Sequence, residues 1–373
     1  MLLSNSGVVI IGTYLVLLMR ENEISTFEIG ILAIPFSFSL MISNAFFGRL
    51  SDYHGRRQFL LIGLILSSVS TIFYIFPINF WTYFLARIFN GIALGIFPSS
   101  LIGIASDNKV KLGWLSSFGS MGWAIGGLIG GIIADQYNLK FVFIFSSIMY
   151  FSAFVLSSKI NVEGHKLFPK RQLQKNEEIR YNEVIKKHWI IYFTLIIRHG
   201  TANGIWIFWP IFLSEELNFS TTQIGMIQAT NMITQFIFMR LIGDKINPKK
   251  MFFVGAIFSS IAFFSFTLVE NFPQMILTQV ILGFSWAMFY VGGLRRVEER
   301  SKESKTVATA TGLFNSSISV AQIIGPFIAI LFLQVSDPFT KTMLFASSIT
   351  FLVTIFYGLI DLYPRNSNAN LFG

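Results

Sequence analysis

A series of long apolar segments dominates this chain and limits what it can fold into. Hydrophobic residues make up 53% of the 373 residues and charged residues only 13%, against about 25% charged in ordinary soluble domains. A helix that crosses a bilayer needs about 20 mostly apolar residues. Segments of roughly that length lie at residues 2–19, 28–47, 58–76, 80–105, 112–134, 141–158, 189–213, 222–242, 251–268, 274–294, 306–333 and 342–362. The pattern predicts an all-α integral membrane protein with twelve transmembrane helices.

Basic residues are distributed unevenly among the connections between these segments. If the chain begins on the cytoplasmic side, the inner connections hold 23 of the 28 Lys and Arg residues and the outer connections hold 3. This asymmetry is what the positive-inside rule predicts when both termini are cytoplasmic. The net charge of +9 therefore reflects membrane topology. The lipid bilayer of the plasma membrane is the expected partner, and nucleic acid is not.

A short charged stretch, residues 48–57, separates the second and third segments. It resembles the signature loop of the major facilitator superfamily of secondary transporters, with the pattern G-x-L-a-D-r-x-G-r-[RK]. The positions that match are Gly48, Leu50, Asp52, Gly55, Arg56 and Arg57. The topology puts this loop on the cytoplasmic face. There Asp52 is expected to meet the positive N-terminal end of the eleventh segment and to act as a gate.

The longest connection, residues 159–188, is predicted to divide the chain into two pseudo-symmetric six-helix bundles, residues 1–158 and 189–373. It is expected to be a cytoplasmic linker that contains a short interfacial helix. The two parts repeat, because residues 25–30 and 220–225 have similar sequences 195 positions apart. Residues 240–250, which include Asp244, are a weaker second copy of the charged loop. Repeated six-helix halves are typical of the same transporter family.

The fifth segment carries a regular series of glycines. Gly122, Gly126 and Gly130 recur every four residues, so they share one helix face and allow a partner helix to approach closely. The series resembles the antiporter motif of the family, although Gly127 stands where proline is expected. The resemblance implies an exporter that exchanges drugs or metabolites for protons. Tight helix packing alone remains an equally open interpretation.

Two arginines lie inside predicted membrane segments. Arg87 resembles the arginine of the family motif R-x-x-q-G, which is implicated in proton coupling. Arg198 lies about 14 Å from the start of its segment, and an intramembrane arginine is a functional-site hypothesis by default. It could hold an anionic substrate group or make a structural contact. Its neighbour His199 is the one group in the predicted core that titrates near neutral pH, and Trp206 could contact a hydrophobic substrate or belong to an interfacial aromatic belt.

Polar side chains also point to a site for a small-molecule substrate. The family resemblance implies that polar faces of the eighth and eleventh segments line a central cavity. The candidates are Gln228, Asn231, Gln235, Asn315 and Gln322. All nineteen carboxylates fall in connections or at segment ends, which argues against a simple buried-carboxylate proton relay.

These features together predict a secondary transporter that moves a small organic solute by alternating access. The first choice is a proton-coupled exporter that works as a monomer. An importer or exchanger of organic anions, anchored by Arg198, remains open, and so does a membrane receptor that transports nothing. Cysteine is absent, no nucleophile–base or metal-ligand spacing is present, and neither enzyme chemistry nor a cofactor or metal is expected.

Overall fold

The computed structural model describes residues 1–108, 110, 112–159, 181–242, 246–301 and 307–362. This part of the chain is almost entirely helical, which confirms the predicted all-α class. The long helices are α1 (Leu2–Glu21), α2 (Thr26–His54), α3 (Arg56–Ile72), α4 (Phe80–Asp107), α5 (Leu112–Gln136), α6 (Leu139–Lys159), α7 (Tyr181–Ile211), α8 (Thr221–Ile242), α9 (Pro248–Ser265), α10 (Phe272–Ser301), α11 (Val307–Phe332) and α12 (Pro338–Tyr357). Four short helices extend them: η1 (Phe73–Ile75), η2 (Phe212–Glu216), η3 (Phe266–Leu268) and η4 (Gly358–Leu362).

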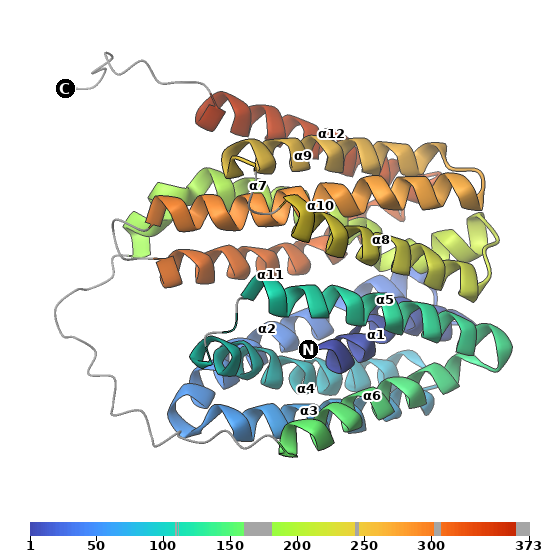
Figure 1. Ribbon diagram of the computed structural model, residues 1–373. Coiled ribbons are helices and arrows are strands. Elements are labelled where there is room, and N and C mark those ends of the chain that lie inside the picture. Colours follow the sequence, from blue (N-terminus) through green and yellow to red (C-terminus); the bar gives the residue numbers. More distant parts are fainter. Residues whose placement is uncertain (109, 111, 160–180, 243–245, 302–306, 363–373) are drawn as a thin grey trace, which may run out of the picture.

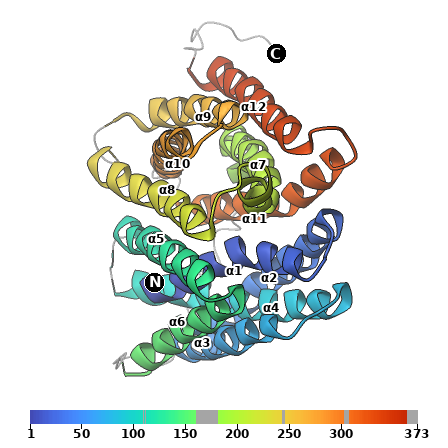
Figure 2. The ribbon, with the colours of Figure 1, turned by 90° about the vertical axis from the view of Figure 1, so that its right-hand side faces the viewer.

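The helices run roughly side by side in two layers. Figure 1 shows α1 to α6 in the lower part of the molecule and α7 to α12 in the upper part. Figure 2, turned by 90°, shows the same two groups meeting along α1, α2, α5, α8 and α11. Among the described residues, ten helices are long and apolar enough to cross a membrane; α7 and α8 are not among the ten. Both carry polar side chains, such as Arg198 in α7 and Asn231 in α8.

Two predicted boundaries differ from the structure. The charged loop 48–57 is largely helical, because α2 continues to His54 and α3 starts at Arg56. Only Gly55 separates them, with φ 105°, a backbone conformation that glycine adopts without a steric penalty. The boundary predicted at His188 falls inside α7, which runs unbroken from Tyr181. The remainder of the predicted interfacial helix lies outside the described residues.

The same helix-start geometry occurs in both groups of helices. Ser25 and Glu28 form a capping box at the start of α2, with each side chain hydrogen-bonded to the other's backbone N–H. Ser220 and Gln223 make the same pair of bonds before α8. Each box follows a non-glycine residue with positive φ, Glu23 at 61° and Asn218 at 53°. Both features are separated by 195 residues, which is the spacing of the sequence repeat.

Serine pairs also recur in the two groups. Ser68 of α3 and Ser147 of α6 each donate to the other's backbone carbonyl, at 3.0 and 2.9 Å. Ser260 of α9 and Ser347 of α12 make the same reciprocal bonds, both at 2.9 Å. Small hydroxyl side chains allow close helix approach and satisfy their hydrogen bonds without water, as membrane helices require.

The glycine series of α5 lies against α1. A Cβ atom added at Gly122 or Gly126 would collide with the carbonyl oxygens of Leu2 and Ser6 respectively, and one at Gly130 would meet the ring of Tyr14. The Ser6 hydroxyl donates to the Gly122 carbonyl at 2.9 Å. The two backbones are therefore nearly in contact.

The neighbouring face of α5 packs against α8 of the other group. A Cβ at Gly131 would collide with the Thr221 carbonyl, and a Cβ at Gly225 would lie 2.6 Å from the Gly127 carbonyl. The Tyr14 hydroxyl donates to the same Gly127 carbonyl at 2.5 Å. Glycine at positions 131 and 225 thus permits backbone contact between the two groups, whereas a Cβ at Gly127, where the family motif has proline, would meet the Gln228 side chain at 3.0 Å. We call this contact the α5–α8 joint.

We predict that Gly126→Val lowers the free energy of unfolding by about 1–3 kcal/mol, because overpacking forces the α1 and α5 backbones apart. The apparent melting temperature of the purified protein in detergent measures the effect. Gly12→Ala is the matched control, since a Cβ at Gly12 meets no atom within 4 Å. An unchanged melting temperature for Gly126→Val would show that the α1–α5 contact contributes little.

Candidate functional site

Arg198 is enclosed by side chains of its own group of helices. It lies in α7 and is only 2% exposed. Its guanidinium carbon sits 5.2, 4.9 and 5.3 Å from the ring centres of Phe263, Trp286 and Phe289, which come from α9 and α10. Its Nε donates to the Ser259 hydroxyl at 2.9 Å. No carboxylate lies within ion-pair distance of it in the described part of the chain.

This environment accounts for how a cation can remain inside the bundle. Aromatic faces attract a cation by about 2 kcal/mol or more when water is absent, and the Ser259 hydroxyl is held in turn by the Ser285 hydroxyl at 2.6 Å. The structure therefore gives Arg198 structural contacts. The binding of an anion by Arg198 stays a prediction. It is compatible with these contacts, because they leave the positive charge without a carboxylate partner among the described residues.

His199 begins a row of near-parallel aromatic rings. Its imidazole lies 5.1 Å from the Trp286 ring centre with an interplanar angle of 27°, and Trp286 lies 5.5 Å from Tyr290 at 25°. All three side chains are partly exposed. The His199 Nδ1 atom is buried and has no hydrogen-bond partner among the described residues. Sequence reasoning singled out His199 but missed Trp286 and Tyr290, because neither residue is charged and neither belongs to a recognised motif.

Trp206 lies two turns beyond His199 on α7. Its ring packs edge-on against Trp209 at 5.4 Å and near Phe266 at 6.1 Å. It remains partly exposed, whereas Trp209 is buried. Trp206 thus extends the aromatic lining of the upper group of helices toward the end of α7.

Arg87 is the second buried cation. It is 7% exposed, its Nε donates to the Leu32 carbonyl of α2 at 3.2 Å, and its guanidinium lies over the Phe36 ring at 4.6 Å. Both contacts flank Pro35, which lacks the N–H that would continue the hydrogen-bonding of α2. The structure places Arg87 as a bridge from α4 to the proline-containing part of α2.

The polar residues of α8 do not share one environment. Gln235 donates from Nε2 to the Asn231 side-chain oxygen at 2.6 Å, both residues are buried, and Asn231 donates in turn to the Gln279 carbonyl of α10 at 3.4 Å. Gln228 instead packs at the α5–α8 joint, beside Gly127. In α11, Asn315 is exposed and Gln322 partly exposed. The structure therefore pairs Asn231 with Gln235 in a buried position, whereas Asn315 and Gln322 keep accessible surface.

The predicted inner gate is described only in part. Gly48 packs beside Ser99 of α4, and Gly55 forms the break between α2 and α3. Arg57 donates from Nη2 to the Ser158 carbonyl at the end of α6, at 2.7 Å, and the Arg56 side chain lies against Gly103 of α4. The side chain of Asp52 and the whole of Asp244 lie outside the described residues, as does the expected contact of Asp52 with α11.

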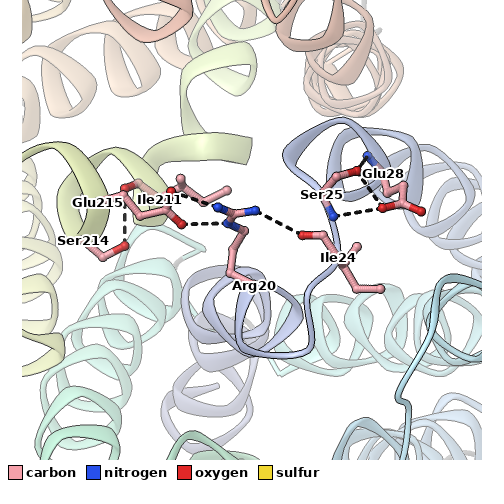
Figure 3. Close-up of polar contacts among 7 residues, drawn as sticks. All are labelled: Arg20, Ile24, Ser25, Glu28, Ile211, Ser214 and Glu215. Carbon is pink, nitrogen blue, oxygen red and sulfur yellow. Dashed lines mark hydrogen bonds and ion pairs between the residues drawn. The ribbon is translucent and has the colours of Figure 1, made fainter.

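An ion pair that the sequence did not predict joins the two groups at the opposite ends of the helices. Arg20, at the end of α1, donates from Nε and Nη2 to the two carboxylate oxygens of Glu215 at 2.7 and 3.1 Å (Figure 3). Glu215 lies in η2, a π-helical turn that follows α7. The side chains are 34% and 43% exposed. The repeat in the sequence could have indicated this pair, because Arg20 and Glu215 are 195 residues apart and therefore occupy equivalent positions in the two groups of helices.

A second polar contact lies at the same end. The Thr222 hydroxyl of α8 donates to the Asp135 carboxylate of α5 at 2.8 Å, and the Thr221 hydroxyl donates to the Gly131 carbonyl at 3.1 Å. Like the Arg20–Glu215 pair, these bonds connect the two groups of helices. Together they form what we call the outer contacts, a name taken from the side on which the predicted topology places them.

Solved structures with this arrangement of helices are membrane transporters. Nucleoside transporter NupG has a TM-score of 0.75 over 97% of this chain and 98% of its own, at 13% identity. Peptide transporter POT in complex with sulfate has a TM-score of 0.78 over 96% of this chain and 92% of its own, at 12% identity. At these identities the likeness defines the fold.

The family follows from the sequence. The chain belongs to the Major Facilitator Superfamily, whose family model matches residues 1–200 and 191–371. It is a multi-pass membrane transporter and not an enzyme, which confirms the predicted family.

Named relatives extend over most of the chain. Multidrug resistance protein 2 of Bacillus subtilis (strain 168) is 24% identical over 98% of this chain and 95% of its own length. Quinolone resistance protein NorA of Staphylococcus aureus (strain MRSA252) is 24% identical over 87% and 85%. Multidrug resistance protein MdtG of Proteus mirabilis (strain HI4320) is 25% identical over 75% and 74%.

We predict that Ser259→Ala lowers the free energy of unfolding by about 1–3 kcal/mol, because a buried N–H of Arg198 loses its acceptor. Thermal unfolding of the purified protein measures the loss. Ser316→Ala is the matched control, since Ser316 is exposed and bonds only the Gly312 carbonyl of its own helix. Equal melting temperatures for the two variants would contradict this assignment.

Proposed function

We propose that this protein exports small organic compounds across the plasma membrane in exchange for protons. The observation that carries the proposal is the similarity of nearly the whole chain to proteins named for multidrug and quinolone resistance. The glycine series of α5, which resembles the antiporter motif, supports the same direction. The protein crosses the membrane twelve times, works as a monomer and keeps both termini in the cytoplasm.

The proposed mechanism is alternating access by two six-helix halves, residues 1–158 and 189–373, joined by the linker 159–188. The recurring caps and serine pairs support the division into equivalent halves. Contacts within each half include backbone-level packing such as Gly126 on Ser6. Between the halves, the α5–α8 joint also packs backbone against backbone, whereas the Arg20–Glu215 pair is partly exposed, and exposed ion pairs contribute only about 0.2–1 kcal/mol. Such weak contacts can break and re-form during a transport cycle.

Proton coupling has few candidate groups in the predicted core. No carboxylate lies near the middle of a described long helix. His199 is therefore the proposed proton-carrying group, since it is an imidazole inside the bundle with a free ring nitrogen. Arg87 would keep α2 and α4 together during the change.

The second candidate function is an importer or exchanger of organic anions. The observation that favours it is Arg198, a cation inside the bundle without a carboxylate partner among the described residues. A receptor that transports nothing has no such observation in its favour.

Proton exchange can be tested with everted membrane vesicles that are acidified inside and loaded with a pH-sensitive dye. We expect compounds from a panel of cationic, neutral and anionic aromatic molecules to release protons from the vesicles when they are transported. Vesicles from the same cells without the protein are the control. If no compound in the panel releases protons although reconstituted protein accumulates one of them, coupling to protons is wrong and the transport itself stands.

The outer contacts can be tested by spin-label distances across the two halves. The chain has no cysteine, so Tyr137→Cys and Glu270→Cys, both exposed outer positions, form a clean labelled pair. We expect Arg20→Gln to raise the population of longer distances about 1.5- to 5-fold, in line with the strength of an exposed ion pair.

The charge-swapped double variant, Arg20→Glu with Glu215→Arg, should restore the original distances. Lys341→Gln is the control, because Lys341 is an outer cation that bonds Ser336 in its own connection. Identical distance distributions for Arg20→Gln and the parent protein would rule out a gating role for the pair.

A further inference from the structure

The aromatic row of α7 and α10 carries an inference about the substrate. We propose that His199, Trp286 and Tyr290, with Arg198 beside them, bind planar aromatic compounds that carry a negative charge. This rests on the proposed transport function, because it names the substrate class of that site. It differs from the general expectation for an exporter of drugs, which leaves the charge of the substrate open.

The row points into the molecule. On α10, Leu277 is 63% exposed and Val280 is 36% exposed. Trp286 is nine residues after Leu277, which places it about 180° around the helix. Trp286 therefore lies on the side of α10 opposite the exposed Leu277, and part of its surface stays accessible.

The α7 side of the row has the same orientation. Phe193 is 42% exposed and lies about 120° around the helix from His199. Trp206 lies seven residues after His199, only about 20° away. His199 contacts Trp286 of α10 and Trp206 contacts Phe263 of α9, so both lie on the face of α7 that is turned toward its own group of helices.

The charge next to the row selects among aromatic ligands. The Arg198 guanidinium lies 4.9 Å from the Trp286 ring centre. A cation there uses the negative face of the indole and repels a second cation. An anion is attracted, because two charges in a low-dielectric interior interact strongly. The described helices offer no mid-membrane carboxylate to compensate, since their acidic residues lie near helix ends.

A polar atom is also left for the ligand. The buried Nδ1 of His199 has no hydrogen-bond partner within the described residues, and an unsatisfied buried polar group normally destabilises a protein. A bound carboxylate can accept a hydrogen bond from an imidazole N–H. The partly exposed rings of the row thus lie next to a buried positive charge and a buried hydrogen-bonding atom that has no partner among the described residues.

Equilibrium binding to the purified full-length protein tests the proposal. The probes are 2-naphthoate, 2-naphthylmethylammonium and cyclohexanecarboxylate, measured by isothermal titration calorimetry. We expect 2-naphthoate to bind at least about tenfold more tightly than the ammonium probe, because the Arg198 charge attracts one and repels the other. It should bind about five- to tenfold more tightly than cyclohexanecarboxylate, because only the naphthalene ring can stack.

Variants separate the contribution of ring stacking to binding from that of the Arg198 charge. Trp286→Leu should weaken 2-naphthoate about five- to tenfold, whereas Trp114→Leu, at a 54% exposed tryptophan of α5, should leave it unchanged. Arg198→Met, which keeps a long side chain in the aromatic enclosure, should remove the preference for the anion. Arg198→Lys should retain part of it and also serves if Arg198→Met does not fold.

Two results would overturn the proposal: binding of the ammonium probe as tight as that of 2-naphthoate, or unchanged 2-naphthoate binding by Trp286→Leu. Binding to purified protein requires neither flux nor a proton gradient, so the outcome is independent of the vesicle experiment. Proton release without a preference for the aromatic anion would leave the exporter standing and remove this inference. Preferential binding of the aromatic anion without proton release would support this inference and contradict the proposed exchange for protons.

Discussion

The close contact of α5 with two partners is the constraint on which the rest of the structure depends. One face of α5 lies on α1 through Gly122, Gly126 and Gly130, and the next face lies on α8 through Gly127 and Gly131. No residue with a side chain fits at several of these positions without moving a backbone. The two groups of helices are thus brought together by a helix that presents main chain on two of its faces, and close backbone approach is one of the ways in which helices associate in lipid without a hydrophobic driving force.

Much of this fold could be predicted from the sequence, because in a bilayer the pattern of apolar segments nearly determines the elements. The all-α class and the transporter family were confirmed. The glycine spacing indicated close packing but could not identify the partner, since α1 and α8 offer similar small residues to two different faces. The loop around Gly55 was predicted to be longer than it is. Charged residues show where the chain leaves the membrane, but a helix can continue through them beyond the membrane edge.

The candidate site was less accessible to sequence reasoning. Arg198 and His199 were noticeable as charge within an apolar run, but their surroundings come from α9 and α10, about 60 to 90 residues away in the chain. Trp286, Tyr290 and Ser259 are ordinary membrane-helix residues when considered alone. The Arg20–Glu215 pair joins residues from the two groups of helices, and such long-range contacts depend on how the groups pack together, which hydrophobic periodicity does not report.

The reciprocal serine pairs have a mechanical consequence. Ser68 with Ser147, and Ser260 with Ser347, fasten α3 to α6 and α9 to α12 by short bonds at buried positions. The hydrogen bonds of both pairs are short, and the hydroxyl groups cannot replace these bonds with bonds to water inside the bilayer. Each of these helix pairs should therefore move as one unit, because sliding one helix past its partner would break two buried hydrogen bonds at once. When one group turns against the other, a small change where the groups meet is then carried along whole helix pairs to a larger displacement at their far ends.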